Sequence, residues 1–271
     1  MGPLLTLDVA TTLDAARQSG QSYIVCSLDL DLSTTTVTLT ENVWLYQDQA
    51  FPYLQNAKDR SIYYWDGEQF SVVARYDKSL IKLVPSAWGA PTFEIDGIKM
   101  LPTSQLSPYE DARRKVELIQ PRDKVVLDTC GGLGYFAAWC VKGKAKRILS
   151  FEKNPDVIWL RRLNPWSPQE DDVLSLTHAD VLSQIESLPT ASVDAILHDP
   201  PRFGIAGELY AQTFYEQLVR VLRRKGRLFH YTGTPNKLTS GRDVPGEVMK
   251  RLQRAGFQAQ RQGDGVLAIK K

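Results

Sequence analysis

Short β-branched segments alternate with helical segments from residue 124 to the end of the chain, and this alternation strongly constrains the fold. Strands are predicted at 125–128, 147–152, 173–178, 193–198, 227–231, 257–261 and 266–270, and helices at 134–141, 155–163, 209–224 and 246–255. Strands separated by helices form a mostly parallel sheet that is covered on both faces. We therefore predict a doubly wound α/β domain with a seven-stranded sheet, in which ligands bind beyond the carboxyl ends of the strands.

The first hundred residues have a different pattern, in which short runs rich in β-branched and aromatic residues are separated by turns. These runs are 23–28, 35–40, 42–46, 61–65, 70–76 and 80–84, and they follow a helix predicted from Leu4 to Gly20. The stretch from Pro102 to Pro108 is typical of a linker. We expect a small β-rich domain over 1–105 and the α/β domain over 106–271.

The net charge of +2 hides an asymmetry, because residues 1–110 carry 7 Lys+Arg and 13 Asp+Glu while residues 111–271 carry 26 and 18. A basic second half favours an anionic partner such as RNA, although basic helices also serve as an ordinary solvated surface. No apolar run approaches the ~20 residues that span a bilayer. The three cysteines are too few for a disulfide framework or a zinc site. We expect a cytoplasmic protein without a membrane partner.

A glycine-rich loop, Asp128-Thr-Cys-Gly-Gly-Leu-Gly134, follows the first strand of the α/β domain and leads into a helix at Tyr135. Gly132 and Gly134 let the backbone approach a ligand closely. Glu152 ends the next predicted strand, where a carboxylate accepts two hydrogen bonds from a ribose diol. These features predict a cofactor that carries a nucleoside.

The acidic residues favour S-adenosylmethionine (SAM) over a dinucleotide. The spacing alone permits NAD, because Ala137 is acceptable at the third glycine position. Asp128, however, would repel a pyrophosphate and attract the amino group of SAM. Asp180, after the third strand, is placed to accept the adenine amino group. Each of these acids is alternatively explained as a cap of a loop, helix or turn.

The fourth predicted strand runs directly into His198-Asp-Pro-Pro201. Pro200 and Pro201 stiffen the chain and leave carbonyls without N–H donors. Asp199 and the Pro200 carbonyl could hold the hydrogens of an amine or amide, which would aim its lone pair at the sulfonium methyl. The alternative is a rigid surface turn with a capped carboxylate.

Other candidate residues surround this corner. His178, His198 and His230 all fall at strand ends, so His198 or His230 is either a proton acceptor or a hydrogen-bonded structural group, while their spacing does not support a metal site. Arg202 suits an acidic or phosphate group. Trp166 either stacks on adenine or substrate or packs in a core.

These motifs resemble those of class I SAM-dependent methyltransferases, in which the cofactor would be held by the glycine loop from Asp128 to Tyr135 together with Glu152 and Asp180. Asp199-Pro-Pro resembles the Asp/Asn-Pro-Pro-aromatic motif of amino-directed methyltransferases, with Arg202 in place of the aromatic residue and Phe203 one position later. From about residue 91 onward the chain is similar to an uncharacterised, mainly archaeal family of predicted methyltransferases. The shared segments are 91–100, 128–135, 164–167, 198–203, 207–210 and 229–233.

The layout also resembles spermidine synthases, through Glu94-Ile-Asp-Gly97, Tyr109-Glu110 and Leu209-Tyr210 with Phe214-Tyr215. In that family Asp199 would match the catalytic aspartate, but the second aspartate of the polyamine-binding loop is missing. A cationic Arg202 near a polycation is unfavourable.

The resemblances together imply a Rossmann-like SAM-dependent methyltransferase acting on a small molecule or RNA, with Arg202, Tyr210 and Trp166 near the acceptor and a homodimer as one option for assembly. Aminopropyl transfer from decarboxylated SAM and a non-catalytic SAM- or RNA-binding module are the alternatives.

Overall fold

The computed structural model describes residues 2–233 and 243–271, and the chain divides into two compact units. Unit 1 comprises Met1–Asp111 together with Trp159–Trp166, and unit 2 comprises Ala112–Ile158 and Ser167–Lys271. A segment from the second half of the sequence therefore packs within the first unit, so a single cut in the sequence does not separate the two.

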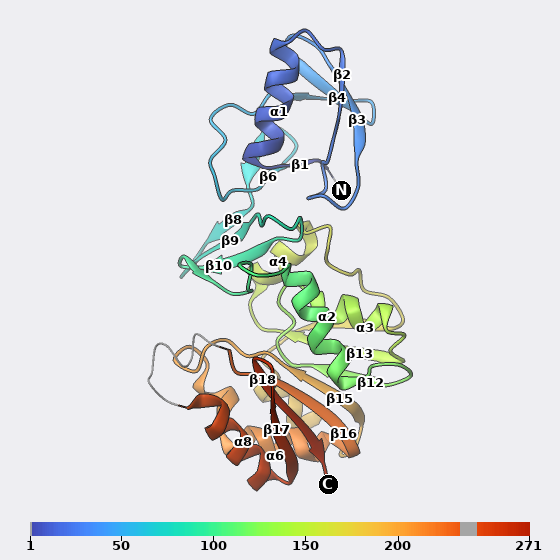
Figure 1. Cartoon of the computed structure of the whole chain (residues 1–271), viewed down its shortest axis with the longest axis vertical. Coiled ribbons are helices and arrows are strands. Elements are labelled where there is room, and N and C mark those ends of the chain that lie inside the picture. Colours follow the sequence, from blue (N-terminus) through green and yellow to red (C-terminus); the bar gives the residue numbers. More distant parts are fainter. Residues whose placement is uncertain (1, 234–242) are drawn as a thin grey trace. The chain divides into compact units, whose positions relative to one another are not determined.

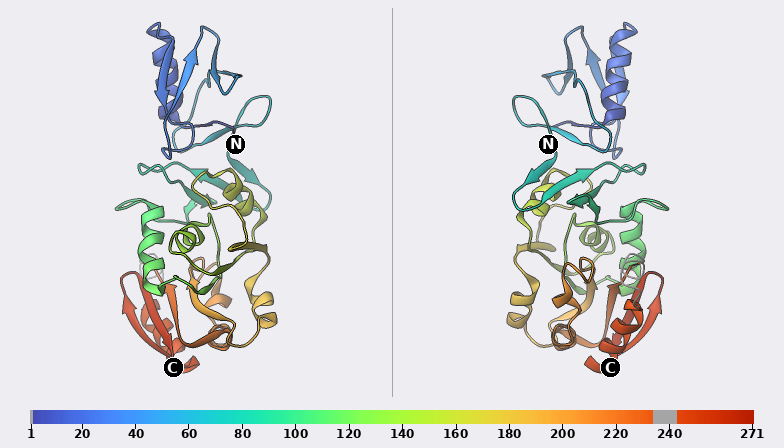
Figure 2. Two further views of the ribbon diagram at one scale, coloured as in Figure 1. Left: turned by 90° about the vertical axis from the view of Figure 1, so that its right-hand side faces the viewer. Right: turned by 90° about the vertical axis from the view of Figure 1, so that its left-hand side faces the viewer.

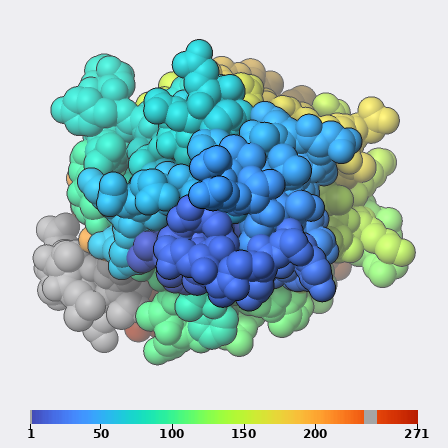
Figure 3. All heavy atoms as spheres, turned by 90° about the horizontal axis from the view of Figure 1, so that it is seen from above, coloured from blue at the N-terminus to red at the C-terminus, as the bar shows by residue number. Residues whose placement is uncertain are grey.

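In its described part, unit 1 contains three antiparallel sheets and the helix α1 (Leu7–Gln18), which Figure 1 shows in blue to green. The sheets are β1-β6-β7 (Leu4–Leu5, Tyr63–Trp65, Phe70–Val72), β2-β3-β4-β5 (Tyr23–Cys26, Thr35–Leu39, Val43–Tyr46, Gln49–Pro52) and β11-β10-β9-β8 (Ile98–Lys99, Thr92–Ile95, Leu80–Val84, Ala74–Tyr76). Trp44 and Phe51 stack with ring centroids 4.7 Å apart at the centre of the core, which α1 covers with Leu13. Figure 3 shows in blue the surface that the N-terminal residues present. This unit confirms the predicted β-rich character of the N-terminal region.

Two of the predicted elements of unit 1 are wrong in extent. The helix predicted from Leu4 to Gly20 begins only at Leu7, because Leu4 and Leu5 pair with β6 as a strand. The strand expected over 70–76 divides at Val73, where the chain crosses between sheets: the Val73 N–H donates to Ile62, and the Val73 carbonyl accepts from Leu83.

The described part of unit 2 is built around a seven-stranded sheet in the order β14-β13-β12-β15-β16-β18-β17. The strands are β12 (Val125–Asp128), β13 (Arg147–Glu152), β14 (Leu174–His178), β15 (Val193–His198), β16 (Leu222–Tyr231), β17 (Phe257–Gln262) and β18 (Gly265–Lys270). β12 to β16 are parallel, and β18 and β17 form an antiparallel hairpin at one edge, red in Figure 2. The predicted doubly wound sheet is confirmed.

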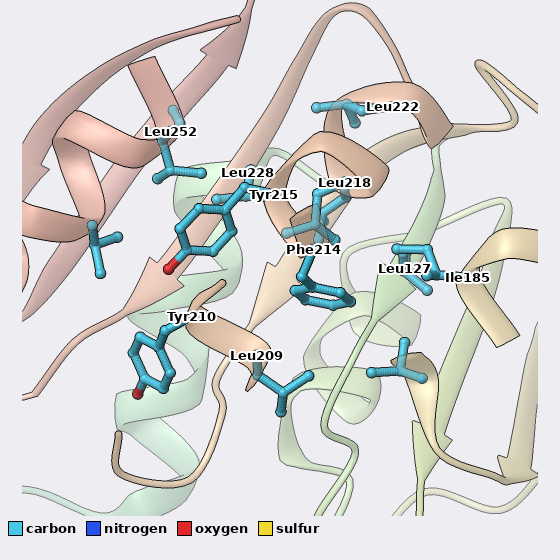
Figure 4. Packing of buried hydrophobic residues seen from close by; sticks show 14 of the residues in the cluster. Leu127, Ile185, Leu209, Tyr210, Phe214, Tyr215, Leu218, Leu222, Leu228 and Leu252 are labelled. Carbon is cyan, nitrogen blue, oxygen red and sulfur yellow. The ribbon is translucent and has the colours of Figure 1, made fainter. Parts of the chain in front are cut away.

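The helices of unit 2 flank this sheet. They are α2 (Pro108–Ile119, whose first turn belongs to unit 1), α3 (Tyr135–Lys142), α4 (Pro155–Leu163, which also spans the unit boundary), α5 (Val181–Gln184), α6 (Gln212–Val221) and α8 (Val244–Ala255), with the short 3-10 helices η1 (Ile185–Ser187) and η2 (Gly207–Tyr210). α6 and α8 pack against each other, and Phe214, Tyr215 and Leu218 of α6 lie in the buried cluster of Figure 4. The predicted helix 209–224 is wrong in extent, because Ala211 is extended (φ −72°, ψ 150°) and Leu222 starts β16.

The strand order reverses between β12 and β15, where Asp128 lies opposite Leu197. The connections that follow these two strands therefore leave the sheet side by side at its carboxyl edge. This is the place where open α/β sheets bind ligands. Among the helices of the described residues, none combines the length and the apolarity that a membrane crossing requires.

Candidate functional site

The glycine loop after β12 has the backbone conformation that its composition predicts. Gly132 and Gly134 adopt left-handed conformations, with φ of +49° and +81°, which side-chain-bearing residues rarely tolerate. Gly134 is the N-cap of α3, and the Gly131 N–H donates to the Phe151 carbonyl at 2.7 Å. The loop is therefore tied to β13 and presents backbone rather than side chains at the carboxyl edge.

Glu152, at the end of β13, is fixed against this loop. Its Oε2 accepts a hydrogen bond from the Gly132 N–H at 2.9 Å, and its Oε1 accepts one from the Asn154 N–H at 2.9 Å. The carboxylate is half-buried, so it has a defined orientation without being sealed from ligands. Its predicted role as a ribose acceptor stays a prediction, and this position beside the loop is suited to it.

Carboxylates from the ends of neighbouring strands gather around Cys130. Burial raises the pKa of the Cys130 thiol well above its ordinary value, and the charges of Glu152, Asp128 and Asp199 raise it further. Asp128 is only 1% exposed, and its Oδ2 accepts a hydrogen bond from the Ser150 hydroxyl at 2.8 Å. Three carboxylates from the ends of β12, β13 and β15 thus act on one thiol of the glycine loop.

Asp180 follows β14 and caps the N-terminus of α5, where its Oδ1 accepts from the Leu182 N–H at 2.9 Å. The capping alternative is thus observed, and the contact with adenine stays a prediction. Lys153, which motif analysis did not single out, places its Nζ 3.7 Å from Asp180 and 3.9 Å from Glu208. It links the connections that follow β13, β14 and β15.

The Asp199-Pro-Pro corner rests on η2. The Tyr210 hydroxyl donates to the Pro201 carbonyl at 3.1 Å, and the Arg251 guanidinium donates to the Tyr210 carbonyl at 2.7 Å. The Phe203 ring packs edge-on against Tyr210, with centroids 5.4 Å apart. Tyr210 is buried among the residues shown in Figure 4, so it supports the corner from within, and its predicted contact with the acceptor stays a prediction.

His198 is buried and bound at both ring nitrogens. Its Nδ1 lies 2.7 Å from the Thr129 hydroxyl, and its Nε2 lies 3.0 Å from the Leu209 carbonyl. Because a carbonyl only accepts, the proton of the neutral ring is assigned to Nε2, and Nδ1 accepts from Thr129. Burial lowers the pKa of His198 to about 4. Its catalytic role as a proton acceptor stays a prediction, and it would require one of these hydrogen bonds to break.

His230, one strand away, is also buried and bound. Its Nε2 lies 2.9 Å from the Tyr215 hydroxyl and its Nδ1 lies 2.8 Å from the Tyr231 carbonyl. Burial and the neighbouring His198 lower its pKa well below the ordinary value, while burial raises the pKa of Tyr215. By contrast, His178 is exposed, with Nε2 3.2 Å from the Lys153 carbonyl.

The remaining candidates differ in their surroundings. Tyr135 is buried in the first turn of α3, whereas Arg202 is half-buried and makes no side-chain hydrogen bond or ion pair with the described residues. Trp166 belongs to unit 1, where its indole N–H donates to the Leu30 carbonyl at 2.9 Å and its ring contacts Tyr109 edge-on. These contacts fit the core-packing alternative for Trp166, and its binding role stays a prediction.

Lys115 on α2, which belongs to none of the sequence motifs, is only 3% exposed. Its Nζ lies 3.6 Å from Asp264 and 3.8 Å from the centre of the Tyr231 ring. A buried charge of this kind is stable only with such partners. The available signal was its helical spacing from the apolar residues Ala112 and Ile119, which places a lysine on the buried face of α2.

Comparisons with known proteins identify the fold and the family. No protein-family model matches the chain. Spermidine synthases share its fold: one in complex with the transition-state analogue AdoDATO has a TM-score of 0.59 at 14% identity over 92% of this chain and 80% of its own. The Thermotoga maritima enzyme has a TM-score of 0.56 at 15% identity over 92% and 78%, and MnmC2 of Aquifex aeolicus has 0.53 at 21% over 72% of each.

A sequence relative is the uncharacterised protein MJ1233 of Methanocaldococcus jannaschii. It is 38% identical over 231 residues, which cover 82% of this chain and 79% of MJ1233. Identity at this level over most of both sequences establishes common descent, and the chain belongs to the family of MJ1233.

Proposed function

We propose that the protein is a SAM-dependent methyltransferase that modifies a nitrogen held at the His198-Asp-Pro-Pro201 corner. The observation that carries this proposal is the gathering of Glu152, Asp128 and Asp199 around the glycine loop at the point where the strand order reverses. A site with negative carboxylates and an approachable glycine backbone suits a cationic sulfonium nucleoside better than it suits a nucleotide phosphate.

The residues present fit this cofactor. Gly132 and Gly134 allow close approach, Glu152 would accept hydrogen bonds from the ribose hydroxyls, and Asp180 would accept one from the adenine amino group. Asp128 is buried, so it would act on the cofactor mainly through its charge. When bound, SAM supplies an electrophilic methyl group on a sulfonium.

On the acceptor side, Asp199 and the Pro200 carbonyl would accept hydrogen bonds from an amine or amide and orient its lone pair. Positioning in a site shielded from water accounts for much of the acceleration that such a transfer needs. The exocyclic amino group of a nucleobase is neutral near pH 7, so it needs no base to free its lone pair before it attacks the methyl group. This suits a corner whose nearest histidine, His198, has a lowered pKa and both nitrogens bound.

The alternative is aminopropyl transfer from decarboxylated SAM. It is favoured by the shared fold with spermidine synthase over 92% of the chain. Arg202 counts against it, because a guanidinium only three residues after Asp199 in the sequence would repel a polyamine and attract an anionic group. RNA-directed methylation is a variant of our proposal that the basic second half supports.

Competitive calorimetry with the two cofactors decides between the reactions, because SAM alone carries the carboxylate. The proposal predicts tighter binding of SAM than of decarboxylated SAM. Preference for the decarboxylated compound would favour aminopropyl transfer, and failure to bind either would refute both. Comparative mass spectrometry of metabolites, RNA and protein from cells with and without the gene then identifies the acceptor.

A further inference from the structure

A buried path of hydrogen bonds joins the glycine loop to the acceptor corner. Thr129 lies in the glycine loop, His198 ends β15 and Leu209 lies in η2, and all of them are buried. The Thr129 hydroxyl lies 2.7 Å from His198 Nδ1 and 3.3 Å from the Leu197 carbonyl, and in the Nε2–H form of the ring it donates to Nδ1. His198 Nε2–H donates to the Leu209 carbonyl at 3.0 Å. We call these residues the Thr129–His198–Leu209 bracket.

Each end of the bracket continues into one half of the proposed site. At the cofactor end, the loop that contains Thr129 is held to Glu152 through the Gly132 N–H at 2.9 Å. At the acceptor end, Tyr210 follows Leu209 directly and donates to the Pro201 carbonyl at 3.1 Å. The path therefore runs from the predicted ribose acceptor to the peptide chain beside Asp199.

The surroundings keep the His198 ring in one orientation. The His230 ring meets it edge-on, with centroids 4.4 Å apart, and Phe214 contacts it at 5.3 Å. His230 is itself held by Tyr215 at 2.9 Å. Because a buried donor or acceptor is costly to leave unsatisfied, neither the loop nor η2 can shift alone without breaking a bond of the bracket.

We propose that His198 is a positioning residue that couples occupation of the glycine loop to the ordering of the Asp199-Pro-Pro corner. This inference rests on the proposed function, since SAM is the ligand that would order the loop. The bracket needs no proton transfer, because the Nε2–H form of the ring makes both hydrogen bonds.

Hydrogen–deuterium exchange of the full chain, with and without saturating SAM, tests the coupling. The matched variants are Thr129→Val, which removes the hydroxyl at similar size, and Thr129→Ser, which keeps it. His198→Asn is a further variant, because its shorter side chain can face Thr129 but cannot reach Leu209. Exchange of the amides of residues 129–134 reports on the glycine loop. Exchange of residues 202–210 reports on the acceptor corner, because Pro200 and Pro201 themselves carry no amide proton.

In the wild type and Thr129→Ser, SAM should slow exchange in both segments. In Thr129→Val and His198→Asn, SAM should still slow exchange at 129–134. The factor by which SAM slows exchange at 202–210 should be roughly 5- to 150-fold smaller than in the wild type, as expected for one lost buried hydrogen bond. Full SAM-induced protection of 202–210 in both disrupting variants would overturn the coupling. If SAM protects neither segment of the wild type, the proposed function fails and the coupling with it.

Discussion

Replacing Glu152 should weaken SAM binding. Comparing its alanine and glutamine variants should distinguish the contribution of the negative charge from that of the hydrogen bond that holds the glycine loop. Its two carboxylate oxygens accept from the Gly132 and Asn154 N–H groups at 2.9 Å each, and the same carboxylate is our ribose acceptor. Charge-assisted hydrogen bonds contribute about 1.5–3 kcal/mol, so Glu152→Ala should raise the Kd for SAM by roughly 10- to 150-fold. Glu152→Gln keeps an oxygen for Gly132 and loses the charge, so its effect should be smaller.

Isothermal titration calorimetry at fixed ionic strength measures these values, and Glu186→Ala, an exposed change in η1, is the control. Thermal unfolding without ligand shows how far the alanine variant also loosens the fold, because Gly132 loses its partner there. An unchanged Kd in Glu152→Ala would refute the assignment of this carboxylate to the ribose.

The remaining predictions concern the acceptor corner and its histidines. Asp199→Ala should raise the Kd for SAM far less than Glu152→Ala does, because Asp199 acts on the cofactor only through its charge, and it should abolish label transfer from SAM to extracts of cells that lack the gene; surviving transfer would show that the acceptor lies elsewhere. His198 has a folded pKa lowered to about 4 from 6.5, so the unfolded chain binds the extra proton between these values. The free energy of unfolding should therefore be highest above pH 6.5 and fall by about 1.4 kcal/mol per pH unit from this residue as the pH drops toward 4. Urea denaturation at pH 7 and pH 5 measures this loss, and a loss of equal size in His198→Asn would contradict the burial of a neutral ring. Arg202→Asp should strengthen binding of spermidine in the presence of S-adenosylhomocysteine, whereas unchanged binding would show that Arg202 does not exclude polycations.

The residues that end the strands could be predicted from the sequence, because an apolar run followed by a glycine or proline corner defines a parallel strand and its carboxyl end. Asp128, Glu152 and His198 each occupy such an end in the structure. Parallel pairing then brings them to one edge of the sheet, so the gathering of acids near the glycine loop followed from local pattern alone.

Features that depend on contacts between distant segments could not be predicted in this way. The interruption of the predicted helix at Ala211 and the passage of the chain between two sheets at Val73 depend on where neighbouring elements pack. In the sequence, the residues around both positions continue the helical or strand pattern without a glycine or proline. The partners of His198 come from the glycine loop and η2, 69 and 11 residues away in the sequence. A histidine at a strand end gives no sign of whether its nitrogens face solvent or such partners.

A crystal structure of the protein with S-adenosylhomocysteine would show whether the cofactor binds at the glycine loop. We expect the nucleoside to lie over residues 129–134, with its ribose hydroxyls on the Glu152 carboxylate and its sulfur on the side of Asp199. A ligand bound at another face of the molecule, or a ribose that makes no contact with Glu152, would contradict this expectation.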